Sequence, residues 1–410
     1  MTAEVAILNT QGAAIAADSA VTISIGSGES KENKIFYTAE KIFRISEKLP
    51  IGIMIYNSAN FMGINWKLII NEYSNRLTDK DRFKKLEDCF NDFIKFLSDF
   101  QYIEHEHKEK IEEAYLKSIC ECCIKNILEY NDELYKQSDI KDEYDRINPE
   151  FVKKNLSSSL KKQIDDIKKI NSNDIPFPDF SGKYIISHKE IIKDTSERVL
   201  GFTISTKQLE DMINLLILQV KTFGLLNYSG VVFVGYGEEE IFPSVCSAKI
   251  LGKFDNDLLF ITDKPNHIDI RNSAMINPYA QADVINTFIR GIDPNLMHTI
   301  LPKLFIQFLN ETGILNGEEA KNMFINLTDT FFNKILKEFI YEKYSEPILD
   351  IVASLPTINL AEMAEALINI TSLRRHNSTD QDTVGGPTDV AIISKVDGFV
   401  WVKRKNNLIY

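Results

Sequence analysis

Apolar positions in the first 60 residues follow the pattern of buried strands. Residues 4–9 (EVAILN) and 13–18 (AAIAAD) are short, largely apolar runs joined by the turn sequence TQG. Such runs around a Gly-containing turn predict a β-hairpin, and we expect it to be buried because both faces are apolar. Residues 41–45 (KIFRI) and 51–56 (IGIMIY) repeat the pattern. The sequence therefore predicts four strands that begin one sheet.

From Asn60 the apolar residues recur at the spacing of a helix. The apolar positions with this spacing are Phe61, Met62, Trp66, Ile69, Ile70 and Tyr73. They predict an amphipathic helix that lies on the sheet. No Gly occurs between Gly63 and Gly182, where charged residues alternate with apolar ones at three- and four-residue steps. We therefore expect a set of helices in this stretch.

The second half of the chain returns to strands and then alternates again. Helices are predicted at 206–223, 278–292, 294–345 and 359–375, and strands at 230–252, 256–263 and 389–405. The last of these segments is predicted to be a hairpin that turns at Asp397-Gly398, because Asp-Gly is a strong turn signal. The order of strands, helices, strands, helices and strands predicts an α+β layered core interrupted by helical insertions.

Charge and length narrow the classes of function. The chain has 410 residues and a formal net charge of −12, and no Lys/Arg cluster stands apart from acidic neighbours. This balance disfavours a nucleic-acid partner, which requires clustered cations to displace counterions. No apolar run approaches the roughly 20 residues that span a bilayer, and no basic segment precedes an apolar one at the start. We therefore expect a cytoplasmic protein that does not associate with membranes.

The cysteines predict free thiols rather than a metal site. There are five of them, Cys89, Cys120, Cys122, Cys123 and Cys246. An odd number without an export signal indicates a reducing compartment. The sequence CECC, with His105 and His107 upstream, offers soft ligands, but the paired CxxC spacing of zinc sites is absent. Of two glycine-containing motifs, 25–28 lacks the Lys and Ser/Thr of a phosphate-binding loop, and 234–237 is not followed by the start of a helix. We expect no metal and no cofactor.

The residues at the N-terminus carry a resemblance to a known family. Thr2 stands before the first strand, Ala16-Ala17-Asp18-Ser19 closes the second, and Lys41 precedes Ile42 and Ile45. In this arrangement the chain resembles the β-type subunits of proteasomes and the HslV-type bacterial peptidases, which are N-terminal nucleophile (Ntn) hydrolases. The resemblance implies that Thr2, once Met1 is removed, is the nucleophile, with Asp18 and Lys41 as its catalytic partners.

Later blocks are similar to the same family, with departures. Residues 229–252 resemble its second sheet, and residues 383–403 resemble its SGG strand and last hairpin. The Gly whose amide lines the family's oxyanion hole aligns with Tyr56. Asp380, Asp382 and Thr383 are approximate counterparts of the accessory Asp and Ser. A further accessory Ser corresponds to Ala280 or Gln281.

The chemistry of an N-terminal Thr explains why these residue types would be needed. A Thr hydroxyl requires a base within hydrogen-bonding reach, and a free α-amine with an ordinary pKa of about 7.7–8.0 is suited to that task. The ammonium of Lys41 would lower the pKa of the amine, because two positive charges repel each other. Asp18 would hold Lys41 in place. Backbone N–H groups near Tyr56 and Asn57 would stabilise the oxyanion.

The resemblance implies an architecture and several partners. The fold would be a four-layer αββα sandwich formed by residues 1–79, 205–292 and 358–410, with helical insertions at 80–204 and 293–357. Family members cleave peptide bonds and assemble into closed rings, so we expect a peptide or protein substrate, a possible homo-oligomeric ring and a possible ATPase or other protein partner on the insertions. Two alternatives remain open, a small-molecule amidase on the same fold and an inactive scaffold that binds a partner.

Overall fold

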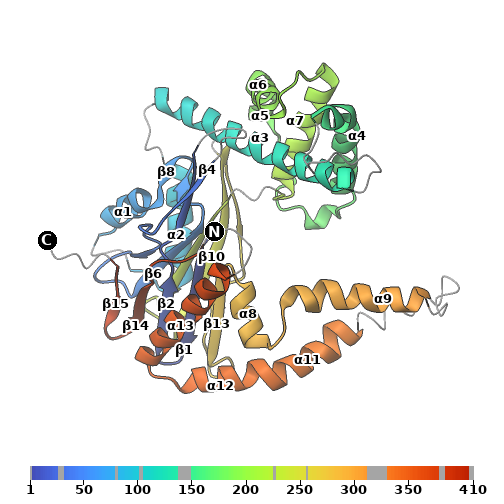
Figure 1. Ribbon diagram of the computed structural model, residues 1–410. Helices are drawn as coiled ribbons and strands as arrows, with labels where there is room; N and C mark the ends of the chain where they lie inside the picture. The colour runs from blue at the N-terminus through green and yellow to red at the C-terminus, as the bar shows by residue number, and fades with distance from the viewer. Residues whose placement is uncertain are drawn as a thin grey trace.

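The computed structural model shows an α+β protein, as the sequence predicted, and its two large sheets are both antiparallel (Figure 1). The residues it describes are 2–25, 32–78, 82–100, 105–136, 149–224, 228–254, 257–311, 330–377 and 384–405. No helix in these ranges is long and apolar enough to cross a bilayer.

The first hairpin of the chain forms the centre of a five-stranded sheet. Its strand order is β13 (Ala274–Ala280), β1 (Ala3–Asn9), β2 (Gly12–Ala17), β14 (Asp389–Ser394) and β15 (Gly398–Lys403), and every pair is antiparallel. The predicted C-terminal hairpin is confirmed, with Gly398 in a left-handed conformation as the first residue of β15. Strands from the two ends of the chain are therefore neighbours.

A second, six-stranded sheet is built from residues 42–57 and 229–267. Its order is β11 (Asp257–Thr262), β10 (Ser244–Phe254), β9 (Ser229–Gly235), β6 (Ile51–Asn57) and β5 (Ile42–Arg44), and the short β12 (Asn266–His267) also pairs with β10. All of these pairs are antiparallel.

The prediction that the first four strands begin one sheet was wrong. Strands β1 and β2 belong to the five-stranded sheet, whereas β5 and β6 belong to the six-stranded sheet. β1 and β2 are buried along their whole length, and β6 is buried except at Asn57. Two-sided burial gives the same apolar pattern in either layer of a sandwich, so the local pattern does not identify the sheet to which a strand belongs.

The two sheets pack face to face, and alternate residues of each strand point to opposite sides. Toward the other sheet, β1 and β2 direct Ala6, Leu8, Ala13, Ile15 and Ala17, which pack against Met54, Val232 and Val234. Away from it they direct Val5, Ile7, Ala14 and Ala16, which pack under helices. The side chains on each face therefore see a different layer.

Helices cover the outer face of each sheet (Figure 1). On the five-stranded sheet lie α8 (Asp283–Arg290), α12 (Glu346–Ser354) and α13 (Thr357–His376). On the six-stranded sheet lie α1 (Trp66–Arg76) and α2 (Leu86–Asp99). These contacts produce the layer order helix, sheet, sheet, helix.

The helix expected from Asn60 begins later than predicted. Residues 60–65 form a small hairpin of β7 (Asn60–Phe61) and β8 (Ile64–Asn65), turned by left-handed Met62 and Gly63. The side chain of Asn65 then accepts a hydrogen bond from the Lys67 N–H and caps α1. Since Asn is among the preferred N-cap residues, the helix begins at Trp66. Another short hairpin, β3 (Val21–Ile25) with β4 (Glu32–Phe36), follows β2.

The residues between α2 and β9 in the sequence form a bundle of helices with its own apolar core (Figure 1). It contains α3 (His105–Lys136), α4 (Pro149–Lys168), the short 3₁₀ turn Ser172–Asp174, α5 (Lys183–Ser187), α6 (Lys189–Leu200) and α7 (Thr206–Lys221). The segment predicted as an insertion, 80–204, differs from this bundle at both ends. Helix α2 packs on the six-stranded sheet, and α7, placed in the core by the prediction, packs with α3–α6.

A second helical excursion extends from the five-stranded sheet (Figure 1). The π-helical segment η3 (Leu296–Ile300) and helix α9 (Leu301–Glu311) run outward. The chain returns toward α12 through the π-helical segment η4 (Phe331–Leu336), α11 (Lys337–Ile340) and the π-helical segment η5 (Tyr341–Ser345). It falls within the predicted insertion 293–357, whose last residues, in α12, pack against the sheet.

Candidate active site

Thr2 lies at the start of β1 and is buried, with 5% of its surface exposed. Its carbonyl oxygen accepts a hydrogen bond from the Gln281 N–H (3.1 Å), which extends the pairing of β1 with β13. Ala6 and Leu8 face the interior between the sheets. Because side chains alternate along a strand, Thr2 and Glu4 belong to the same face.

Asp18 follows β2, and its carboxylate accepts four hydrogen bonds. Oδ1 accepts from Lys41 Nζ (2.6 Å) and from the Ala3 N–H (2.9 Å). Oδ2 accepts from the N–H groups of Ala20 (3.1 Å) and Gly385 (3.0 Å). Hydrogen bonds to a charged group are stronger than those between neutral groups. The buried carboxylate therefore fixes the ends of β1 and β2 relative to Lys41.

Lys41 supplies the cation of the site and is 6% exposed. Its carbonyl oxygen accepts a hydrogen bond from the Ile55 N–H (2.9 Å), which anchors the residue to β6. Lys41 Nζ and the Ala3 N–H contact the same oxygen of Asp18. The ammonium thus lies within two hydrogen-bond lengths of the peptide bond between Thr2 and Ala3. The structure brings Asp18 and Lys41 together at the Thr2 end of β1.

Tyr56 and Asn57 lie at the end of β6, in the sheet opposite Thr2. The Tyr56 ring is buried against Tyr279 (ring centroids 5.6 Å apart) and meets Tyr228 edge-on (6.3 Å). Burial raises the pKa of the Tyr56 hydroxyl far above its ordinary value. Asn57 has a φ of 69°, and its side-chain amide donates to the Tyr228 carbonyl oxygen (2.8 Å). Tyr279 lies opposite Glu4 on β1, so Tyr56 reaches the Thr2 strand through Tyr279.

Gly385 and Gly386 bring the segment before β14 close to Asp18. Ser19 N–H donates to the Gly385 carbonyl oxygen (3.2 Å), and the Gly385 N–H donates to Asp18. Gly386 has a φ of 78°, and a Cβ there would lie 2.7 Å from the Tyr37 ring. Glycine is required at this position because a side chain would be both strained and crowded.

Only some of the predicted accessory residues lie in the part of the chain that the structure describes. Asp380, Asp382 and Thr383 lie outside the described residues, so their roles stay predictions. Ala280 ends β13 with a left-handed φ of 59°, and Gln281 is buried beside Thr2 through its backbone hydrogen bond.

The prediction from sequence missed Glu4, which is fully buried in the middle of this cluster. Within the described part of the chain, neither carboxyl oxygen has a hydrogen-bond partner. Burial raises the pKa of the Glu4 carboxyl well above its usual range, Lys41 opposes this shift, and Asp18 adds to it. The signal was present in the sequence, because Glu4 is the one charged residue in the buried strand AEVAILN.

A second buried ion pair supports the segment that carries Lys41. Lys405 Nζ lies 3.2 Å from Asp389 Oδ2, and the two side chains are only 3% and 5% exposed. The same ammonium donates to the carbonyl oxygen of Ala39, two residues before Lys41. Asp389 Oδ1 also accepts from the Lys405 N–H (2.8 Å). The end of β15 is thereby tied to the Lys41 segment.

Lys405→Met is expected to destabilise the fold by about 3–5 kcal/mol, because it leaves the Asp389 carboxylate buried without its cation. Urea unfolding measures this free energy. Lys403→Met is the matched control, since Lys403 pairs with Glu365 at a partly exposed position where ion pairs contribute little. Equal effects of the two substitutions would contradict the role assigned to Lys405.

Two cysteines of the CECC sequence lie in an apolar core. Cys120 and Cys123 are buried in the helical bundle of α3–α7, and burial raises the pKa of the Cys120 thiol to about 11. The side chains of His105 and His107 lie outside the described residues. Among the residues that the structure describes, no group of three His, Cys, Asp or Glu is placed to hold a metal ion.

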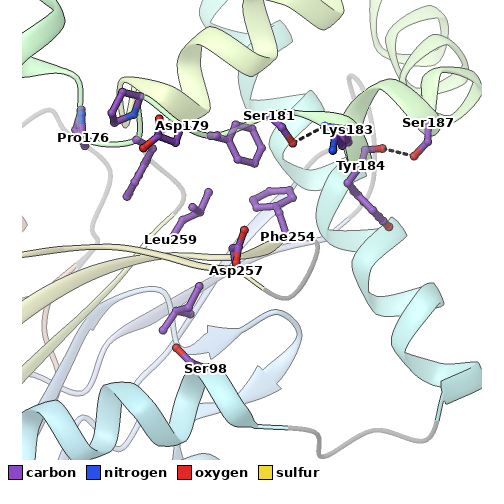
Figure 2. Close-up of a pocket in the computed structure, with 14 residues that line it drawn as sticks. Ser98, Pro176, Asp179, Ser181, Lys183, Tyr184, Ser187, Phe254, Asp257 and Leu259 are labelled. Carbon is purple, nitrogen blue, oxygen red and sulfur yellow. Dashed lines mark hydrogen bonds between the residues drawn. The ribbon is translucent and has the colours of Figure 1, made fainter.

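A cavity of about 940 Å³ lies between the helical bundle and the β10–β11 hairpin (Figure 2). Its lining includes Phe177, Phe180, Phe254 and Leu259, with the carboxylates of Asp179 and Asp257. None of the residues around Thr2 lines it. The cavity is therefore separate from the Thr2 cluster.

The Ser187 hydroxyl, which lines this cavity, is not arranged for nucleophilic attack. Ser187 Oγ donates to the Tyr184 carbonyl oxygen (2.8 Å) and lies 3.0 Å from His188 Nδ1. That nitrogen is also 2.8 Å from the Tyr184 carbonyl oxygen. Because a carbonyl oxygen only accepts hydrogen bonds, Nδ1 carries its proton there. It is then unable to accept the proton of Ser187.

Comparisons with known proteins do not name a family. No family model matches the sequence, and no curated protein matches it at a significant level.

Proposed function

We propose that this chain is a threonine-type Ntn hydrolase that cleaves peptide or other amide bonds with Thr2 as its nucleophile. The observation that carries the proposal is the Asp18 carboxylate, which accepts from both Lys41 Nζ and the Ala3 N–H. One carboxylate thus links a buried cation to the peptide bond that follows Thr2. An ion pair that only stabilises the fold would not have to lie next to the peptide bond of the proposed nucleophile.

The fold supports the same proposal. The layer order helix, sheet, sheet, helix agrees with the αββα sandwich that the N-terminal resemblance implies. Thr2 precedes β1 on the strand face that points between the sheets, and the buried Asp18–Lys41 pair is joined to the N–H of the next residue, Ala3. The helical bundle and the second excursion are additions to this core, suited to partner binding or to control of substrate access.

Removal of Met1 would free the α-amine of Thr2, so that one residue would carry both the nucleophile, Oγ, and the base. The free α-amine takes the proton from Oγ as Oγ bonds to the substrate's carbonyl carbon. The nearby positive charge of Lys41 favours the neutral form of the amine, and Asp18 holds Lys41 in position. Backbone N–H groups at the Tyr56–Asn57 end of β6 are the proposed donors to the oxyanion.

The proposed reaction proceeds in two steps that balance. In the first, the amide C–N bond breaks, the acyl group remains on Thr2 Oγ as an ester, and the α-amine passes its proton to the leaving amine. In the second, water attacks the ester carbon and gives one proton to the α-amine. The carboxylic product leaves, and the proton returns to Thr2 Oγ.

A specific observation favours a second candidate, a catalytically inactive scaffold. Tyr56 aligns with the family's oxyanion-hole Gly, and its ring fills space between the sheets against Tyr279. A site blocked in this way would bind no substrate. The two candidates differ in one respect that is easily measured, which is whether an electrophile labels Thr2.

The mature protein is expected to begin at Thr2. Thr is small enough for methionine removal, and the proposed base exists only when the Thr2 amine is free. Intact mass and N-terminal sequencing of the purified full chain measure this directly. A variant that carries a non-cleavable N-terminal extension is the control, and it should fold but fail to react with a β-lactone probe. A chain that retains Met1 would contradict the proposal.

A further inference from the structure

Within the described residues, the buried carboxyl group of Glu4 has no hydrogen bonds, an energetically unfavourable arrangement, and it has no role in the proposed mechanism. It lies two residues from Thr2 on the same strand face, so its backbone is roughly 7 Å away at the rise of a β-strand. It is fully buried, and both carboxyl oxygens lack hydrogen-bond partners in the described part of the chain.

The energetic cost indicates that Glu4 serves more than packing. An ionised carboxylate without a partner is costly to bury, and a protonated one still forfeits hydrogen bonds worth about 1–3 kcal/mol. Ala6 and Leu8, the next residues on that strand face, are apolar. An apolar residue at position 4 would avoid this cost, so stability alone does not account for a carboxyl group there.

The charged and titratable groups around Glu4 come from each packed element. Asp18 follows β2, Lys41 precedes β5, Tyr56 belongs to β6 and Tyr279 to β13, and each interacts electrostatically with Glu4. On its own strand, the neighbouring titratable group is the α-amine that Thr2 gains on processing. Lys41 is the one cation in this set, and Asp18 already holds it.

We propose that Glu4 is a positioning residue that sets the charge around Lys41 and thereby sets the pH at which the Thr2 amine becomes a base. This inference rests on the proposed function of Thr2. With Glu4 neutral, Asp18 and Lys41 balance each other. With Glu4 ionised, the cluster carries a net negative charge, which stabilises the protonated form of the Thr2 amine. A higher pH is then needed to free the amine as a base, and above that pH the amine is neutral whatever the charge on Glu4.

The same ionisation affects stability in a defined direction. Burial raises the pKa of Glu4 in the folded chain above the value of 4.5 that an ordinary Glu has. The folded state therefore binds more protons than the unfolded state between those two pKa values, and stability falls as the pH rises through that window. Glu4→Gln, which remains neutral, removes this loss.

The test measures the rate at which a β-lactone acylates Thr2 as a function of pH. For the wild type we expect the rate to rise at a higher pH than for Glu4→Gln, by up to about one pH unit, the effect of one nearby charge on a pKa. The variant should therefore react up to about tenfold faster on the rising limb and equally fast above it. Glu4→Asp should retain the wild-type position of this rise. The matched control, Glu47→Gln, alters an exposed carboxylate and should reproduce the wild-type profile.

The outcomes distinguish this inference from the proposed function. Superimposable pH profiles of wild type and Glu4→Gln would overturn the role of Glu4 while leaving Thr2 as the nucleophile. A wild-type chain that the probe never labels at Thr2 would overturn the proposed function itself. Urea unfolding gives an independent readout, in which Glu4→Gln should gain stability relative to wild type as the pH rises. An equal pH dependence of the two would also overturn the role of Glu4.

Discussion

Replacement of Thr2 by Ala is expected to abolish acylation of the protein and to reduce amide hydrolysis by roughly a thousandfold or more, the usual scale for loss of a nucleophile. The substitution removes Oγ but retains a small residue, so methionine removal still exposes an α-amine. The base, Lys41 and Asp18 would all remain. The loss would then report on the hydroxyl group alone, and the rate of β-lactone labelling measures it.

Two matched variants make this prediction specific. Thr2→Ser keeps a hydroxyl and should retain measurable labelling. Thr10→Ala removes a Thr hydroxyl at the opposite end of β1, in the turn to β2, and should label at the wild-type rate. Labelling of Thr2→Ala at the wild-type rate would contradict the assignment of the nucleophile.

Asp18→Ala is expected to destabilise the protein by about 3–5 kcal/mol, because it leaves the buried Lys41 ammonium without its partner. It also deprives the N–H groups of Ala3, Ala20 and Gly385 of their acceptor. The free energy of unfolding in urea measures this effect. The exposed pair of Arg44 with Glu47 is the comparison, and its disruption should change stability little.

The double variant Asp18→Asn with Lys41→Met separates stability from chemistry. Replacing a buried ion pair by neutral side chains of similar size is often close to neutral for stability. The double variant should therefore recover much of the stability lost in Asp18→Ala. It should react more slowly with the probe near neutral pH, since Lys41 then no longer favours the neutral form of the Thr2 amine. Full reactivity of the double variant would show that the pair is only structural.

Much of the fold was accessible from the sequence because strands and helices leave different periodicities. The hairpin of β1 and β2, helix α13 and the final hairpin were predicted close to their observed bounds. Assignment of strands to sheets failed, because buried strands in either layer show the same apolar pattern. The start of α1 was missed because the Asn65 cap and the turn at Met62 and Gly63 are local features that override periodicity.

Only part of the candidate site could be predicted in the same way. Asp18 and Lys41 were singled out because they match the family resemblance at the N-terminus; by pattern alone each is a polar residue at a strand end. Their contact depends on how two sheets stack, and the resemblance rather than periodicity suggested it. Asp389 and Lys405 are brought together by the final hairpin, so no local sequence motif indicates that they pair. Glu4 was overlooked because it is a single charged residue with no partner at a spacing typical of a catalytic motif.

The most direct test of the central claim is tandem mass spectrometry of the full wild-type chain after reaction with the β-lactone probe. The account predicts one covalent adduct, an ester on the side chain of Thr2 in a chain that begins with Thr2. An adduct confined to another residue, or a chain that still begins with Met1 and reacts equally well, would contradict it.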